Sequence, residues 1–216
     1  MKNIYLVCTV HEELGLANVI NLHAILEKLQ PEVIFLEVPA DAFENFYIER
    51  IKENLESKAV FQYSNNHHVE LIPIDLPTPD ERFFTNNRYL FERIEGNSTD
   101  YRRLMDWYRS YVFDHGFAYL NSDHYSKHLS ELNDAILTSI HKIGDPKITK
   151  LYELWNKTNQ LRDIEMMEKI LKYSSDYTFE KAVFLIGAAH RPSIIEKAKE
   201  QVFHNTGSIK WDFYLQ

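Results

Sequence analysis

Short apolar runs alternate with helix-like segments in the first third of the chain. Residues 3–9, 33–38 and 69–74 are apolar stretches of strand length. Between them, residues 12–29 and 39–57 carry apolar side chains at helical spacing. Because strands that alternate with helices form crossover units, this pattern predicts a mainly parallel sheet flanked by helices.

The middle of the chain has a different pattern. Between residues 80 and 173 the apolar positions recur at helical spacing, without a convincing strand signal. Thr99, Ser122 and Asp145 are residue types that favour helix starts. We therefore expect residues 80–173 to form a large helical insertion that lies as a lid over the carboxyl ends of the strands.

The end of the chain returns to the first pattern. The sequence predicts a buried strand at residues 182–187, a helix from 192 to about 203, and an edge strand near 208–214. A chain of 216 residues is long enough for one large domain. The expected fold is therefore a single α/β domain spanning residues 1–216, with the helical insertion inside it.

Composition narrows the class of partner. The net charge of −8 and the lack of a Lys/Arg-rich block argue against a nucleic-acid partner. Apolar runs in the sequence are shorter than a membrane span, so we expect no membrane partner. The single Cys8 excludes an internal disulfide, and no signal peptide is recognisable, so we expect a cytoplasmic protein. The sequence does not indicate an oligomeric state.

Three polar residues follow apolar runs of strand length. His11 follows the first run, Glu37 ends the second, and His190 follows the strand predicted near the end of the chain. In an open α/β sheet, residues just past the carboxyl ends of strands line one crevice, so these side chains should converge. They could bind a divalent metal or act as general acid and base. The alternative is that each histidine only caps or packs at a strand end.

Arg162 lies on the apolar stripe of the last predicted helix of the insertion. A core-facing arginine cannot deprotonate, so it needs an anion beside it. That anion could be Glu37 or Asp75, or it could be a substrate carboxylate or a developing oxyanion. The alternative is a surface arginine whose charged end reaches solvent.

These residues resemble the signature of the TraB/GumN/Tiki family, which belongs to a wider superfamily with erythromycin-esterase-like and ChaN-like proteins. The signature has a Gly-x-x-His after the first strand, a Glu ending the second, an Arg-(Asn/Asp)-x-x-Met helix and a second Gly-x-x-His. The matching residues are, in that order, His11, Glu37, Arg162 with Asp163 and Met166, and Gly187 with His190. Cys8 stands where the family usually has its first Gly. Asp75, with Arg82 seven residues later, resembles the family's central Asp motif.

The resemblance implies a metal-dependent hydrolase that cleaves a peptide, ester or lactone bond in a small-molecule or peptide substrate. His11, Glu37 and His190 would hold Mn, Co or Zn, or activate water. Arg162 would stabilise negative charge, with Asp75 and Asp163 in support. Because ChaN-like members bind haem, the alternative is a non-catalytic module that binds haem or another ligand. A protein with a decayed site is a third reading.

Two weaker candidates lie outside this constellation. Cys8 could be a nucleophile with a histidine base, although a buried inert thiol is the commoner outcome for a cysteine in an apolar strand. His124 and His128 are four residues apart on a predicted helix and could bind a metal, although such pairs more often lie on a solvated face.

Overall fold

A five-stranded parallel sheet forms the centre of the computed structural model, which describes residues 1–204 and 209–213. The strand order is β3-β2-β4-β1-β5, and every neighbouring pair is parallel. The strands are β1 (Lys2–Thr9), β2 (Val33–Leu36), β3 (Glu70–Pro73), β4 (Lys181–Gly187) and β5 (Ile209–Asp212). The predicted α/β fold with a mainly parallel sheet is confirmed. The predicted edge strand began at residue 208 and ended at residue 214, and both of these lie outside the described residues.

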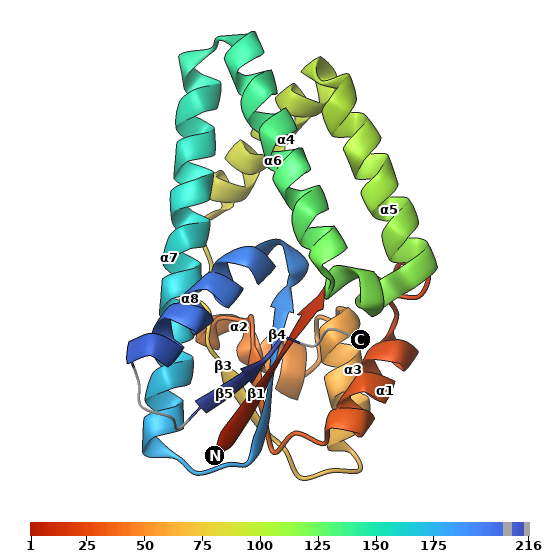
Figure 1. Ribbon diagram of the computed structural model, residues 1–216, viewed down its shortest axis with the longest axis vertical. Helices are drawn as coiled ribbons and strands as arrows, with labels where there is room; N and C mark the ends of the chain where they lie inside the picture. The colour runs from red at the N-terminus through yellow and green to blue at the C-terminus, as the bar shows by residue number, and fades with distance from the viewer. Residues whose placement is uncertain (205–208, 214–216) are drawn as a thin grey trace.

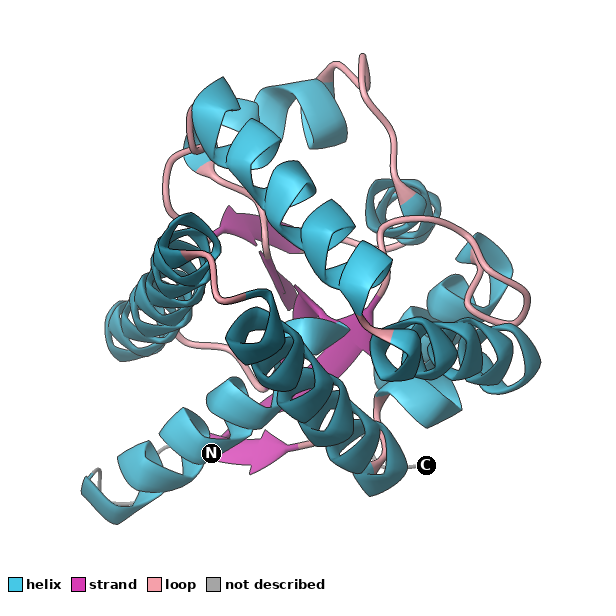
Figure 2. Ribbon diagram, turned by 90° about the horizontal axis from the view of Figure 1, so that it is seen from above, coloured by secondary structure: helices cyan, strands magenta, loops and turns pink. Residues whose placement is uncertain are grey.

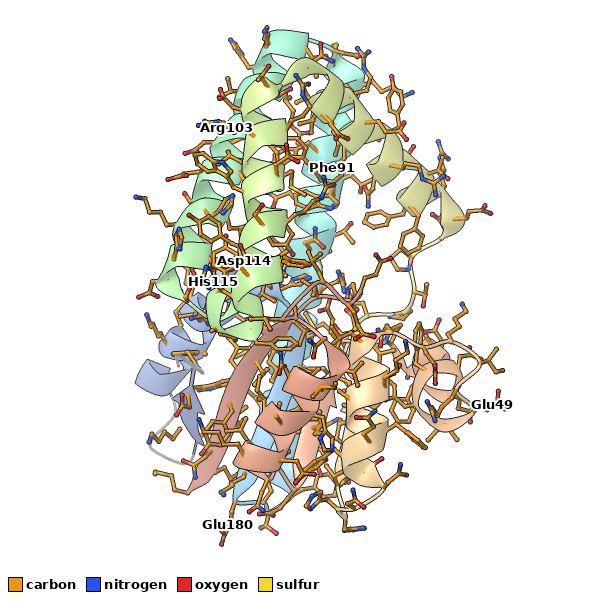
Figure 3. All side chains as sticks on the ribbon, turned by 90° about the vertical axis from the view of Figure 1, so that its right-hand side faces the viewer. Glu49, Phe91, Arg103, Asp114, His115 and Glu180 are labelled. Carbon is orange, nitrogen blue, oxygen red and sulfur yellow. The ribbon has the colours of Figure 1, made fainter. Side chains whose placement is uncertain are left out.

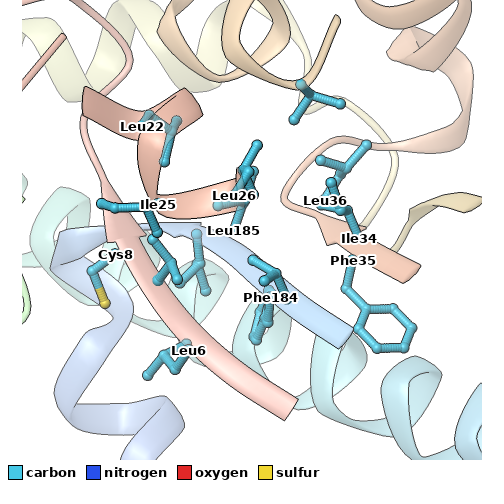
Figure 4. Close-up of a cluster of buried hydrophobic side chains, with 14 of the residues drawn as sticks. Leu6, Cys8, Leu22, Ile25, Leu26, Ile34, Phe35, Leu36, Phe184 and Leu185 are labelled. Atoms are coloured by element: carbon cyan, nitrogen blue, oxygen red, sulfur yellow. The ribbon is translucent and has the colours of Figure 1, made fainter. Parts of the chain in front are cut away.

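Helices cover both faces of the sheet (Figures 1 and 2). Helices α1 (Val19–Leu29) and α3 (Leu55–Ser64) pack against each other, and α8 (Arg191–His204) packs with the helix that precedes β4. Figure 4 shows Leu22 and Leu26 of α1 on one side of the sheet, and Leu6 and Cys8 of β1 on the other. The central strands are therefore buried on both faces, which explains their continuous apolar sequence.

The first predicted helix is shorter than its apolar pattern suggested. Residues 12–29 were expected to be helical, but α1 begins only at Val19. Asn18 ends the preceding loop, because its side chain accepts a hydrogen bond from the backbone N–H of Asn21. The loop before it is closed by an antiparallel bridge between Leu14 and Ala17. The expectation was wrong because this bridge places apolar residues at a spacing that also fits a helix.

The second predicted helix is divided into three parts. Residues 39–57 contain α2 (Ala40–Phe43), a π turn η1 (Glu44–Ile48), and then the start of α3. Arg50 has a left-handed backbone with φ of 55°, which ends the helical path. A capping box between Asn54 and Ser57 starts α3. The apolar stripe of the sequence runs across this break, and the predicted single helix was therefore wrong.

Four long helices connect β3 to β4. They are α4 (Glu81–Asn97), α5 (Thr99–Leu120), α6 (Asp123–Ile143) and α7 (Pro146–Asp176). Their N-terminal caps are Asp80, Ser98, Ser122 and Asp145. Figure 1 shows them rising beyond the carboxyl ends of the strands. Their upper parts enclose an apolar cluster of their own, which includes Leu90, Leu104, Ile136 and Ile148. The lower parts of α5, α6 and α7 reach the main core.

The lower end of α5 joins the insertion to β1. Gly116 interrupts the helix with φ of 53°, and a Cβ there would lie 2.6 Å from the carbonyl carbon of Leu16, so only glycine fits. The side chain of Asn121 then bonds both backbone groups of Cys8. Figure 3 shows Asp114 and His115 at this end of α5, and Arg103 higher on the same helix. Within the described residues, no helix is both long and apolar enough to cross a membrane.

Candidate functional site

Four strand ends and one helix supply the charged residues of the candidate site. His11 follows β1, Glu37 directly follows β2, Asp75 lies just beyond β3, and His190 ends the short 3-10 helix η2 (Ala188–His190) that follows β4. Because β1, β4, β2 and β3 are successive neighbours in a parallel sheet, these positions share one edge. Arg162 approaches the same edge from α7.

Arg162 joins the ends of β2 and β3. Its Nη2 lies 2.8 Å from Asp75 Oδ2 and 2.5 Å from Glu37 Oε1, and its Nε lies 3.0 Å from Asp75 Oδ1. The arginine side chain is 21% exposed and both carboxylates are 7% exposed. Burial alone would lower the pKa of Arg162, but the bonds to Asp75 and Glu37 raise it, so the guanidinium stays charged.

Glu37 is the centre of this buried charge network. Its Oε1 accepts from Arg162 and lies 3.3 Å from His190 Nε2, and its Oε2 accepts from the backbone N–H of Gly187. Burial would raise the pKa of Glu37, but His190, Arg162 and the Gly187 N–H together hold it well below its usual range. Glu37 therefore remains ionised although it is buried.

His190 lies between two carboxylates. Its Nδ1 is 2.5 Å from Asp163 Oδ1, and its Nε2 faces Glu37. Burial would lower the pKa of His190, but the two carboxylates raise it to about 9. At neutral pH the ring is therefore an imidazolium that donates from both nitrogens. Arg162 Nη1 lies 3.4 Å from Nε2, and the carboxylates around both groups offset the repulsion between these like charges.

A second carboxylate–imidazole pair lies beside the first network. His11 Nδ1 is 3.2 Å from Glu56 Oε1, which also accepts a bond of 2.6 Å from the Thr9 hydroxyl. The backbone N–H of Leu55 bonds the His11 carbonyl and fixes the start of α3 against this loop. The hydrogen bond to Glu56 raises the pKa of His11, although the His11 side chain is 61% exposed and solvent screens the pair. Glu56 Oε2 is buried without a hydrogen-bond partner among the described residues.

Sequence reasoning missed Glu56. The apolar stripe over residues 39–57 placed it near the end of a predicted helix, whereas it lies in the first turn of α3. The pattern Asn54-x-x-Ser57 is a capping signal that could have marked this helix start. A helix beginning just after Asn54 would have brought Glu56 toward the strand ends.

A small pocket lies between the two networks. It measures about 230 Å³, including open solvent at its mouth, and its polar lining includes His11, Glu37, Tyr47 and Glu56. His190 and Arg162 contact Glu37 but do not line the pocket themselves. The predicted residues therefore form two linked groups: Glu37 contacts His190 directly, whereas His11 contacts Glu56 and shares only the pocket with Glu37.

The donor atoms do not fit a divalent metal in this arrangement. Among the described residues, no group of three or more His, Cys, Asp or Glu side chains is placed to hold a metal ion. Glu37 and His190 are hydrogen-bonded to Arg162, Asp163 and each other. The guanidinium thus occupies the place beside Glu37 that a bound cation would take.

The surroundings of the weaker candidates, Cys8, His124 and His128, are typical of structural residues and not of catalytic or metal-binding ones. Burial raises the pKa of Cys8 to about 12, so its thiol is a poor nucleophile at neutral pH. His128 is buried: its Nδ1 lies 2.5 Å from the Tyr119 hydroxyl and its Nε2 lies 3.0 Å from the Leu104 carbonyl. His124 packs edge-on against aromatic rings. The solvated face favoured for this histidine pair was therefore wrong for His128, because the insertion has a core of its own.

Comparisons of this chain with protein-family models, with curated proteins and with solved structures find no match. The resemblance to the TraB/GumN/Tiki family therefore remains a prediction from the sequence, which rests on Glu37, Arg162, His190 and their neighbours.

Proposed function

We propose that this protein is a hydrolase that uses His11 to activate water against an ester, lactone or peptide bond. The observation that carries the proposal is the His11–Glu56 pair at the pocket that Glu37 also lines. A carboxylate that holds Nδ1–H leaves the other nitrogen, Nε2, free to accept a proton from water. His11 is the more exposed member of the pair, so a substrate can reach it.

The buried network is proposed to position this chemistry. Arg162 and the His190 imidazolium keep Glu37 ionised and fix its carboxylate at the pocket. Asp163 orients His190, and Asp75 orients Arg162. A rigid arrangement of charges of this kind costs little reorganisation during a reaction.

The resemblance stated above supports a small-molecule or peptide substrate, and the size of the pocket supports entry of the reacting group alone. His11, Glu37, Arg162 and His190 match the signature of that superfamily, some members of which open a lactone or cleave peptides. The sequence left two roles open for His11, Glu37 and His190: to hold a metal or to activate water. The proposal takes the second role and assigns it to His11, with Glu56 as its partner.

The test is hydrolysis by the purified protein of p-nitrophenyl acetate, a simple lactone and a fluorogenic peptide, each with and without EDTA. We expect turnover that EDTA does not reduce. His11→Ala should abolish it, while His141→Ala, a change on an exposed position of α6, should not. No turnover on any substrate, or equal turnover in both variants, would contradict the proposal. Activation by Mn, Co or Zn would favour the metal route, and a Soret band would favour the haem-binding alternative.

A further inference from the structure

Tyr47 lines the same pocket from a backbone segment with unusual geometry. It lies in the π turn η1 between α2 and α3, and its ring stacks on Phe43 with centroids 5.5 Å apart and planes at 17°. Single π turns are rare and occur frequently at functional sites, because the extra residue changes the direction of a side chain. Figure 3 shows Glu49, just after this turn, at the periphery of the molecule. The turn therefore faces solvent on one side and the pocket on the other.

The Tyr47 hydroxyl is free to donate a hydrogen bond. It forms no hydrogen bond with another described residue, and it is not among the buried unpartnered atoms. Burial, followed by the charges of Glu56 and Glu37, raises the pKa of Tyr47 well above its ordinary value. The phenol therefore keeps its proton at neutral pH.

Among the described side chains that line the pocket, two have a donor without a partner that an anionic oxygen could use: the Tyr47 hydroxyl and the Asn54 amide NH2. The carboxylates of Glu37 and Glu56 only accept, and the Gly187 N–H is bonded to Glu37. His11 is occupied as the base in the proposed function, and the Asn54 side-chain oxygen is held by the capping box. Hydrolysis of an acyl bond creates an oxyanion, which in water-excluded sites needs a preorganised donor. Among the polar side chains that line the pocket, Tyr47 supplies a neutral hydroxyl for this purpose.

We propose that Tyr47 is a further catalytic residue, which donates its hydroxyl hydrogen to the oxyanion of the tetrahedral intermediate. This inference rests on the proposed hydrolase function. A water oxygen bonds to the acyl carbon, its proton moves to His11, and the carbonyl electron pair moves to the oxygen that faces Tyr47. When the carbonyl re-forms, the bond to the leaving group breaks and the leaving group takes the proton from His11. Tyr47 keeps its proton throughout.

The test compares Tyr47→Phe with the wild type on p-nitrophenyl acetate and on phenyl acetate. Loss of an oxyanion donor should lower kcat by about 10²-fold or more on both esters, with KM little changed. Tyr89→Phe removes a hydroxyl from an exposed position on α4 and should leave kcat unchanged. Tyr47→Gln, whose amide can also donate, should recover part of the loss. Thermal unfolding of each variant shows that the fold is retained.

The possible results distinguish the role of Tyr47 from the proposed hydrolase function. If Tyr47→Phe turns over normally while His11→Ala is inactive, the role of Tyr47 is overturned and the hydrolase proposal stands. If the loss is much larger on phenyl acetate than on the activated ester, Tyr47 protonates the leaving group instead, and the oxyanion role is overturned. If the wild type hydrolyses neither ester nor the lactone and peptide above, both proposals are overturned.

Discussion

At the scale of single residues, the protonation of His11 determines the pH at which the proposed base works. Glu56 raises the pKa of His11 to about 9, so most of the histidine is protonated and inactive as a base at neutral pH. The activity of the wild type should therefore increase as the pH rises from neutral toward about 9. Glu56 thus orients the ring and at the same time moves its working range to alkaline pH.

Glu56→Gln tests this directly. Glutamine can hold the imidazole by a hydrogen bond but removes the charge, so the acidic limb of kcat/KM should move toward lower pH. The profile is measured with p-nitrophenyl acetate from pH 5 to pH 10. Glu131→Gln, on an exposed position of α6, is the matched control and should leave the limb in place. An acidic limb that stays where it is in Glu56→Gln would show that His11 is not the titrating base.

At the scale of elements, Arg162 fastens α7 to the ends of β2 and β3. Arg162→Met would leave Glu37 and Asp75 buried without their shared cation. Breaking a buried ion pair from one side costs roughly 3–5 kcal/mol, so the free energy of unfolding in urea should fall by an amount of that order. Arg162→Lys should cost less, because lysine keeps the charge but cannot bridge two carboxylates with a planar fork.

The control for this change is Arg103→Met on α5. Arg103 pairs with Asp100 on an exposed surface, and such a pair contributes only about 0–1 kcal/mol. Equal losses in Arg162→Met and Arg103→Met would mean that the arginine bridge does not hold α7 against the sheet. Turnover of Arg162→Lys, measured beside its stability, then separates a role in the reaction from a role in the fold.

Local signals explain which elements could be predicted from the sequence. The strands were predictable because β1, β2 and β4 are buried on both faces and are continuously apolar, and Ser122 and Asp145 marked helix starts through their capping side chains. The two errors, over residues 12–29 and 39–57, arose where an apolar stripe continues across a loop. Glu37, Arg162 and His190 could be found because strand ends and a helix stripe determine their positions. Glu56 and Tyr47 could not, because the break at Arg50 directs both of them to the pocket.

At the scale of the whole molecule, the buried charges join two parts that have separate apolar cores. The α/β part contains the main cluster, and the upper insertion contains its own. Helix α7 extends through both (Figure 1). Its residues Arg162 and Asp163 contact Glu37, Asp75 and His190 at the ends of the strands. The state of this network should therefore influence the stability of the protein as a unit.

The pH dependence of unfolding follows from the signs of the two shifts. His190 has a pKa of about 9 in the folded protein and 6.5 when unfolded. Its contribution to the free energy of unfolding is therefore fully present below about pH 6.5 and is lost as the pH rises through 9. Glu37 has a depressed pKa, so its contribution is present above pH 4.5 and decreases as the pH falls below that value. The melting temperature should therefore decrease from pH 6.5 to pH 9, with an additional contribution of the same sign from His11.

His190→Gln should flatten this alkaline slope, whereas His141→Gln should leave it unchanged. A wild-type melting temperature that rises between pH 6.5 and 9 would show that His190 is not held as an imidazolium between Glu37 and Asp163.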